Sequence, residues 1–138
     1  MQSRTNMYKL ISGIVAGLCL LIGAAINTSY TRDFLRHSVV VPGRVVAQDY
    51  GPNHPKIEFV TLKGSHISRP QGGFLPATDI GDVVPVRYRP HAPLQSATLD
   101  YFWTLWGEAF LLLLVGIACL IGSAVNFYLL KRQNPGFK

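Results

Sequence analysis

Two long apolar runs without a charged residue place the strongest constraint on this chain of 138 residues. Residues 10–26, LISGIVAGLCLLIGAAI, form the first run, and residues 109–130, AFLLLLVGIACLIGSAVNFYLL, form the second. A helix rises about 1.5 Å per residue, and the hydrocarbon core of a bilayer is roughly 30 Å thick. The second run can span that core, and the first can do so once Tyr8 and Tyr30 are counted as its interfacial ends. We therefore predict transmembrane helices at residues 10–30 and 101–130.

The first run has one alternative interpretation, a cleaved signal peptide. Arg4 and Lys9 supply a basic n-region, and IGAA offers small residues for cleavage. The run is longer than most signal-peptide h-regions, which favours an uncleaved membrane helix.

Basic residues predict how the chain crosses the membrane. The tails, residues 1–9 and 131–138, contain Lys and Arg but no acidic residue, whereas residues 31–100 contain eight Lys or Arg and six Asp or Glu. Because Lys and Arg accumulate on the cytoplasmic side, both tails are expected in the cytoplasm and the middle segment in the periplasm of a bacterial inner membrane. Arg32 and Arg36, beyond the first run, oppose this orientation. The net charge of +6 is interpreted as membrane topology rather than nucleic-acid binding.

The segment from residue 37 to residue 100 has the composition of a small β domain. Val84, Val86 and Tyr88 alternate with Arg87 and Arg89, as in a half-buried strand. Lys63-Gly64 predicts a hairpin turn after KIEFVTL, and four or five short strands are expected in all. Pro42-Gly43 suggests a bend or an edge position, and Pro85 an edge strand or a bulge. The predicted fold class is membrane α+β, with two transmembrane helices flanking a small antiparallel β-barrel or sandwich.

The same segment resembles a known bacterial family through three stretches, GRVVAQ, PKIEFVTLKG and IGDVVPVRYRPHAPLQSATLD, set between two hydrophobic spans. It is similar to the bacterial two-span domain-of-unknown-function family numbered three-five-nine-two. The matching positions are Gly43, Val45, Pro55, Ile57, Phe59, Thr61, Gly64, Gly81, Asp82, Val84, Val86, Tyr88, Pro90, Pro93, Ala97 and Asp100. Arg89 stands where such segments often carry an acidic residue, and Pro85 interrupts the strand. The resemblance implies fold and placement but no activity.

Residues that could perform catalysis or bind a metal are few. The four histidines, His37, His54, His66 and His91, lack the short ligand spacing of a zinc site, although Asp49, Glu58, Asp79 and Asp82 occur in the same segment. No hydrolase motif is present, and both cysteines, Cys19 and Cys119, fall inside the apolar runs. We therefore expect no enzyme activity, no cofactor and no bound metal.

Candidate contact residues lie on the predicted helices and on the β domain. Small and polar residues recur at helical intervals at Gly13, Gly17, Ala24 and Asn27 in the first run, and at Gly116, Ser123 and Asn126 in the second. Such faces let helices approach closely, either each other or another membrane protein. On the β domain, Arg69, Arg87 and Arg89 are the expected partner-binding side chains. Glu108 is the one charge in the second hydrophobic region and is either interfacial or a polar intramembrane site.

These features favour a non-enzymatic inner-membrane protein that presents a periplasmic β domain for protein–protein interaction. It would serve as an accessory subunit or as part of an oligomer, with membrane lipid and either another membrane or periplasmic protein or a second copy of itself as partners. The alternative is an immunity protein that neutralises a secreted toxin at the membrane or in the periplasm. Such a protein would also act by presenting a membrane-anchored β domain that binds another protein. A catalytic role would require a metal at the histidines.

Overall fold

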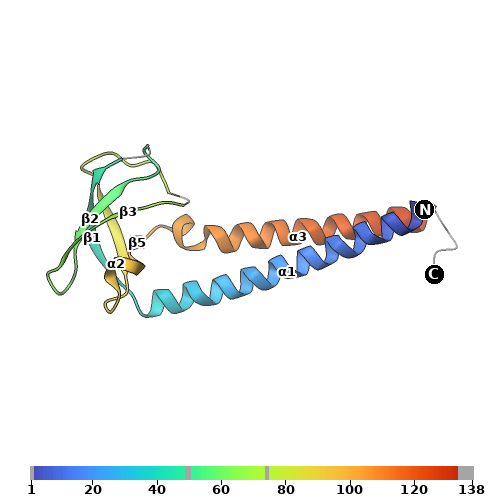
Figure 1. Cartoon of the computed structure of the whole chain (residues 1–138), viewed down its shortest axis with the longest axis horizontal. Coiled ribbons are helices and arrows are strands. Elements are labelled where there is room, and N and C mark those ends of the chain that lie inside the picture. Colours follow the sequence, from blue (N-terminus) through green and yellow to red (C-terminus); the bar gives the residue numbers. More distant parts are fainter. Residues whose placement is uncertain (1, 49–50, 74, 134–138) are drawn as a thin grey trace. The chain divides into compact units, whose positions relative to one another are not determined.

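The computed structural model describes residues 2–48, 51–73 and 75–133. The chain divides into two compact units, which are described separately. The first contains Met1–Asn27 and Ala109–Lys138, and the second contains Thr28–Glu108. Figure 1 labels the elements.

The first unit is a pair of helices formed by most of α1 (Gln2–Arg36) and most of α3 (Phe102–Gln133). Both contain a window that is long and apolar enough to cross a membrane, and only 11% of each window is buried. The predicted bounds, 10–30 and 101–130, largely coincide with these helices, which continue beyond the apolar runs. A core helix of a soluble protein would bury far more of its apolar surface.

The two helices touch through small residues. A Cβ atom added to Gly17 would lie 3.1 Å from the carbonyl oxygen of Gly116, and one added to Gly116 would lie 3.2 Å from that of Gly17. One added to Gly13 would lie 2.3 Å from the Oγ atom of Ser123. Because these positions carry little or no side chain, the two backbones approach closely.

The second unit contains a five-stranded antiparallel sheet in the order β3-β2-β1-β4-β5. The strands are β1 (Val39–Ala47), β2 (Lys56–Val60), β3 (His66–Pro70), β4 (Val83–Tyr88) and β5 (Thr98–Leu99), and the short helix α2 (Pro93–Ser96) precedes β5. Side chains connect the β3 side of the sheet to the α2–β5 side. Arg69 donates to the carbonyls of Leu94 and Gln95 at 2.7 and 2.6 Å, and Gln71 donates to that of Ala97 at 3.4 Å. The sheet is therefore curled into a half-barrel, which can be followed in Figure 1.

The core lies on the concave face of the sheet and follows the predicted alternation. In β4, Val84, Val86 and Tyr88 are buried, whereas Arg87, and Arg89 just after the strand, are only partly covered. The remaining buried core residues are Val41, Val45, Ile57, Phe59, Leu75, Ala97 and Leu99. The Tyr88 hydroxyl reaches the end of the core and accepts a hydrogen bond of 2.8 Å from the backbone N–H of Leu62. The buried tyrosine thus keeps a polar partner.

The β2–β3 turn agrees with the prediction made from Lys63-Gly64. Gly64 has a φ of +82°, a conformation that L side chains rarely adopt, and its N–H donates to the carbonyl of Thr61 at 2.9 Å. The N–H of Thr61 donates to the carbonyl of Ser65, which closes the hairpin.

The two strand prolines are placed differently from the prediction. Pro42 lies inside β1, the central strand, opposite Pro85 of β4, and neither marks an edge strand. Consecutive residues of an antiparallel strand direct their hydrogen-bonding groups to opposite neighbours. Val45 bonds to the β4 side through Asp82, so Pro42 faces β2, whose pairing with β1 starts only at Gly43. Pro85 faces β5, where its carbonyl accepts from Asp100. Neither proline therefore removes a donor from the β1–β4 ladder.

Candidate functional site

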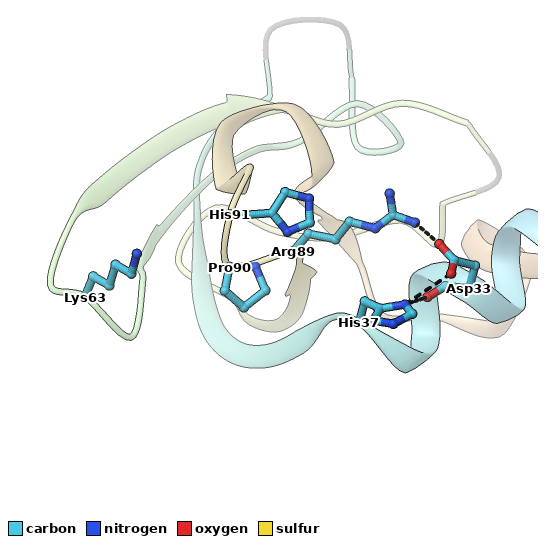
Figure 2. A pocket seen from close by; sticks show the side chains of 6 residues that line it. All are labelled: Asp33, His37, Lys63, Arg89, Pro90 and His91. Carbon is cyan, nitrogen blue, oxygen red and sulfur yellow. Dashed lines mark hydrogen bonds and ion pairs between the residues drawn. The ribbon is translucent and has the colours of Figure 1, made fainter.

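A cavity of about 560 Å³ in the second unit is lined by more ionisable side chains than either of the two further cavities described below. Three separate segments supply its lining: the end of α1, the tip of the β2–β3 hairpin and the chain that leaves β4 (Figure 2). The lining residues are Asp33, His37, Lys63, Arg89, Pro90 and His91. With one carboxylate among one lysine, one arginine and two histidines, the cavity favours anionic groups.

Arg89 and Asp33 form the central contact of this cavity. The Nη2 atom of Arg89 donates to the Oδ2 atom of Asp33 at 2.7 Å, and the guanidinium lies over the ring of Phe34 with its carbon 5.5 Å from the centroid. Their side chains are 30% and 56% exposed, respectively, so the ion pair itself contributes little, about 0.2–1 kcal/mol.

One buried donor of Arg89 has no acceptor in the described part of the chain. Its Nε atom is buried and has no hydrogen-bond partner among the described residues. A buried donor without an acceptor costs about 1–3 kcal/mol. The charge of Arg89 is therefore paired with Asp33, but no described residue accepts from its buried Nε–H.

The last turn of α1 determines where Asp33 lies. Asp33 and His37 are four residues apart, so they share one face of the helix. The Nδ1 atom of His37 lies 3.1 Å from Oδ1 of Asp33 and 2.9 Å from the Asp33 carbonyl oxygen. Neither residue was predicted as a site residue, although their i, i+4 spacing is visible in the sequence.

The other two arginines predicted to contact a partner have partners in their own chain. Arg87 donates from Nε and Nη2 to the two carboxylate oxygens of Asp100, at 2.7 and 3.1 Å, and it is only 18% exposed. Arg69 lies opposite Ile57 in the register, on the core side of the sheet, and bridges to the α2 segment. Of the three, only Arg89 lines the cavity.

The predicted helix-face residues fall into two groups. Gly13, Gly17, Gly116 and Ser123 lie between the two helices of the first unit. Ala24 is buried, whereas Asn27 and Asn126 are partly exposed. Glu108 is exposed, and no ion pair involves it within the part of the chain that the structure describes.

The four histidines that were considered as metal ligands are dispersed. Among the described residues, no group of three or more His, Cys, Asp or Glu side chains could hold a metal ion, and Asp49 lies outside those residues. His37 and His91 share the cavity, whereas His66 lies 3.8 Å from Glu58 on the sheet. His54 is exposed in a loop, with Gly72 nearby.

Two further surfaces of the second unit could contact a partner. A groove of about 480 Å³ on the convex face of the sheet includes Arg44 and Glu58 among exposed apolar residues such as Val60 and Val83. An apolar cavity of about 570 Å³ is lined by Leu75, Pro76, Tyr101, Phe102 and Trp103. In neither surface do the lining side chains form a catalytic or metal-binding arrangement.

Comparison with known proteins identifies the family. No protein-family model matches the chain, so the resemblance to the domain-of-unknown-function family stays a prediction, and no solved structure matches it either. The chain is 37% identical over 106 residues to a protein of Pseudomonas aeruginosa named immune protein Tsi4. The aligned region covers 77% of this chain and 72% of that protein. At this identity and coverage, the chain belongs to the family of immune protein Tsi4.

Proposed function

We propose that the chain is an immunity protein, which protects the cell that makes it by binding a toxin that acts at the membrane or in the periplasm. The observation that carries this proposal is the 37% identity to immune protein Tsi4 over most of both chains. It supports the immunity alternative rather than an accessory subunit or an oligomer component.

The geometry of the second unit fits a protein that acts by binding. Several of its ionisable side chains pair within the fold, as Arg87 and Asp100 do, and its cavities are open to solvent. We infer that protection involves no catalysis and no cofactor. The cavity at Arg89 is the proposed contact site for the toxin.

We further propose that α1 and α3 cross the inner membrane and present the β domain to the periplasm, with both tails in the cytoplasm. The length, apolar character and low burial of the two helices support the membrane crossing, and the basic tails favour the orientation. It would position the β domain where a toxin delivered from outside the cytoplasm first arrives.

A competition assay tests the proposed function even while the toxin is unidentified. The gene is deleted in the strain that encodes it, and the deletion strain is grown in contact with its parent on a solid surface. An immunity protein predicts that the deletion strain is killed by its parent and survives beside a strain that lacks the secretion machinery. Plasmid expression of the chain should restore survival.

Equal survival of the deletion strain beside its parent, under conditions in which the parent kills other bacteria, would contradict the proposal. The matched control expresses the chain with Lys56→Arg, a conservative change at a residue that lines none of the three cavities described above. This variant should protect as well as the unmodified chain.

A further inference from the structure

We propose that the cavity at Arg89 receives an acidic side chain of the protein partner, and that this carboxylate replaces Asp33 on the Arg89 guanidinium. The inference rests on the proposed function in that the partner is the toxin. It adds the chemical class of the contacting group and the exchange by which that group is bound.

Arg87 in β4 and Arg89 just after it bind their carboxylates differently. Arg87 presents Nε and Nη2 together to the two oxygens of Asp100, which is the bidentate arrangement in which guanidinium and carboxylate bind most strongly. Arg89 gives Asp33 only Nη2, while Nε stays buried without a partner. A carboxylate that reached both Nε and Nη2 of Arg89 would form the bidentate pair that Asp33 does not form.

Arg89 must release Asp33 for the exchange to occur. Because Nε is covered in the resting structure, the Arg89 side chain has to leave Asp33 before a new carboxylate can bind both donors. Asp33 is more than half exposed and also contacts His37, so it can be solvated after release. The incoming group therefore competes with a weak exposed ion pair rather than with a buried one.

The number of cations that line the cavity favours an acidic protein segment over an anionic membrane surface as the ligand. Lys63 and Arg89 are the two permanently charged cations of the cavity, and Asp33 offsets one of them. Recognition of anionic lipid surfaces uses clusters of about four to eight Lys or Arg. The cavity falls well short of that number, whereas its one guanidinium, with Nε unpaired, matches a single directional carboxylate. His37 and His91 add donors at its rim.

The test observes Arg89 directly. The full-length chain is labelled with ¹⁵N-arginine and placed in nanodiscs of phosphatidylcholine, and the Nε–H resonance of Arg89 is assigned by its absence from the Arg89→Lys variant. Capped tetraglutamate is the probe and capped tetralysine is the charge control. We expect the Arg89 resonance to shift with tetraglutamate and not with tetralysine, while the resonance of Arg44 stays in place.

Asp33→Asn tests whether Asp33 opposes binding of the carboxylate. If Asp33 competes for the guanidinium, this variant binds tetraglutamate about 1.4- to 5-fold more tightly, the factor that corresponds to an exposed ion pair. Lys63→Ala should weaken binding. Unchanged or weaker binding by Asp33→Asn would overturn the exchange, and an Arg89 resonance that does not respond to the probe would overturn the site.

A third arm tests the membrane as the source of the anion. If nanodiscs that contain phosphatidylglycerol shift the Arg89 resonance without peptide, and tetraglutamate then adds nothing, the site is occupied by lipid phosphate and the proposal is wrong. Failure of this inference is distinct from failure of the proposed function. If the chain protects cells but does not bind the probe, the proposed function stands and the proposed site is wrong. If the chain binds the probe but does not protect cells, the site stands and the proposed function is wrong.

Discussion

Gly43 lies where three neighbours occupy the space that a side chain would need. A Cβ atom at this buried position of β1 would lie 2.5 Å from a methyl group of Val86, 3.2 Å from the carbonyl oxygen of Glu58 and 3.4 Å from the Cβ atom of Phe59. The strands on both sides of the central strand would therefore have to move. Glycine allows the inner faces of β2 and β4 to pack across β1.

We predict that Gly43→Ala destabilises the sheet by about 1–3 kcal/mol, the usual cost of overpacking a core. Hydrogen exchange of the β1 and β2 amides, measured by mass spectrometry on the full chain in detergent, should accelerate roughly 5- to 100-fold if those amides exchange by unfolding of the sheet. Gly72→Ala is the matched control, because its Cβ would approach no atom more closely than 3.9 Å. Equal exchange in the two variants would show that Gly43 is not needed for packing.

Arg87 and Arg89 show what the sequence could and could not predict about single residues. Alternation in β4 correctly placed Arg87 away from the core. Its acidic partner, Asp100, is 13 residues away, and the partner of Arg89, Asp33, is 56 residues away. Pairs at such separations depend on the tertiary fold, so a single sequence cannot reveal them.

Elements were easier to predict where one physical signal dominates. Uncharged runs of helix-forming residues predicted α1 and α3, and alternation with a glycine turn predicted the β2–β3 hairpin. The prolines of β1 and β4 led to a wrong prediction of edge strands. A proline lacks a donor on only one side of its strand, and the sequence does not show whether a neighbouring strand lies on that side. The half-barrel also depends on Arg69 reaching the α2 segment, a contact 25 residues apart.

The helix pair offers a direct test of its small-residue contact. A Cβ atom at Gly13 would lie 3.6 Å from the Cβ atom of Ser123, within the range that a disulfide requires. With Cys19→Ala and Cys119→Ala as background, we predict that Gly13→Cys with Ser123→Cys forms a disulfide within one chain on mild oxidation in membranes. The mobility of the protein on non-reducing gels measures its yield.

Adding Gly17→Leu to this crosslinking background should reduce the yield, because the side chain would collide with Leu120 and with the backbone at Gly116. Gly122→Leu adds the same side chain where no atom lies within 4 Å and should leave the yield unchanged. If both leucine variants crosslink equally, the contact at Gly17 does not hold the helices together.

At the scale of the whole molecule, charge is distributed unevenly along the chain. All seven acidic residues lie between residues 33 and 108, whereas both tails carry only basic residues. Arg32 and Arg36 place charges at the opposite end of α1, so the bias across the first helix is small. The basic C-terminal end of α3, with Lys131 and Arg132, therefore contributes most to the proposed orientation.

Cysteine labelling tests this orientation and the proposed membrane crossing together. With both native cysteines replaced by alanine, Ser68→Cys places a thiol on the exposed edge strand β3, and Ser3→Cys places one in the N-terminal tail. We predict that a membrane-impermeant maleimide labels the Ser68→Cys variant in intact spheroplasts and the Ser3→Cys variant only after lysis. The reverse pattern would place the β domain in the cytoplasm, out of reach of a periplasmic toxin. Labelling of both variants before lysis, with lysis of the spheroplasts excluded by a cytoplasmic marker, would show that α1 does not separate two compartments.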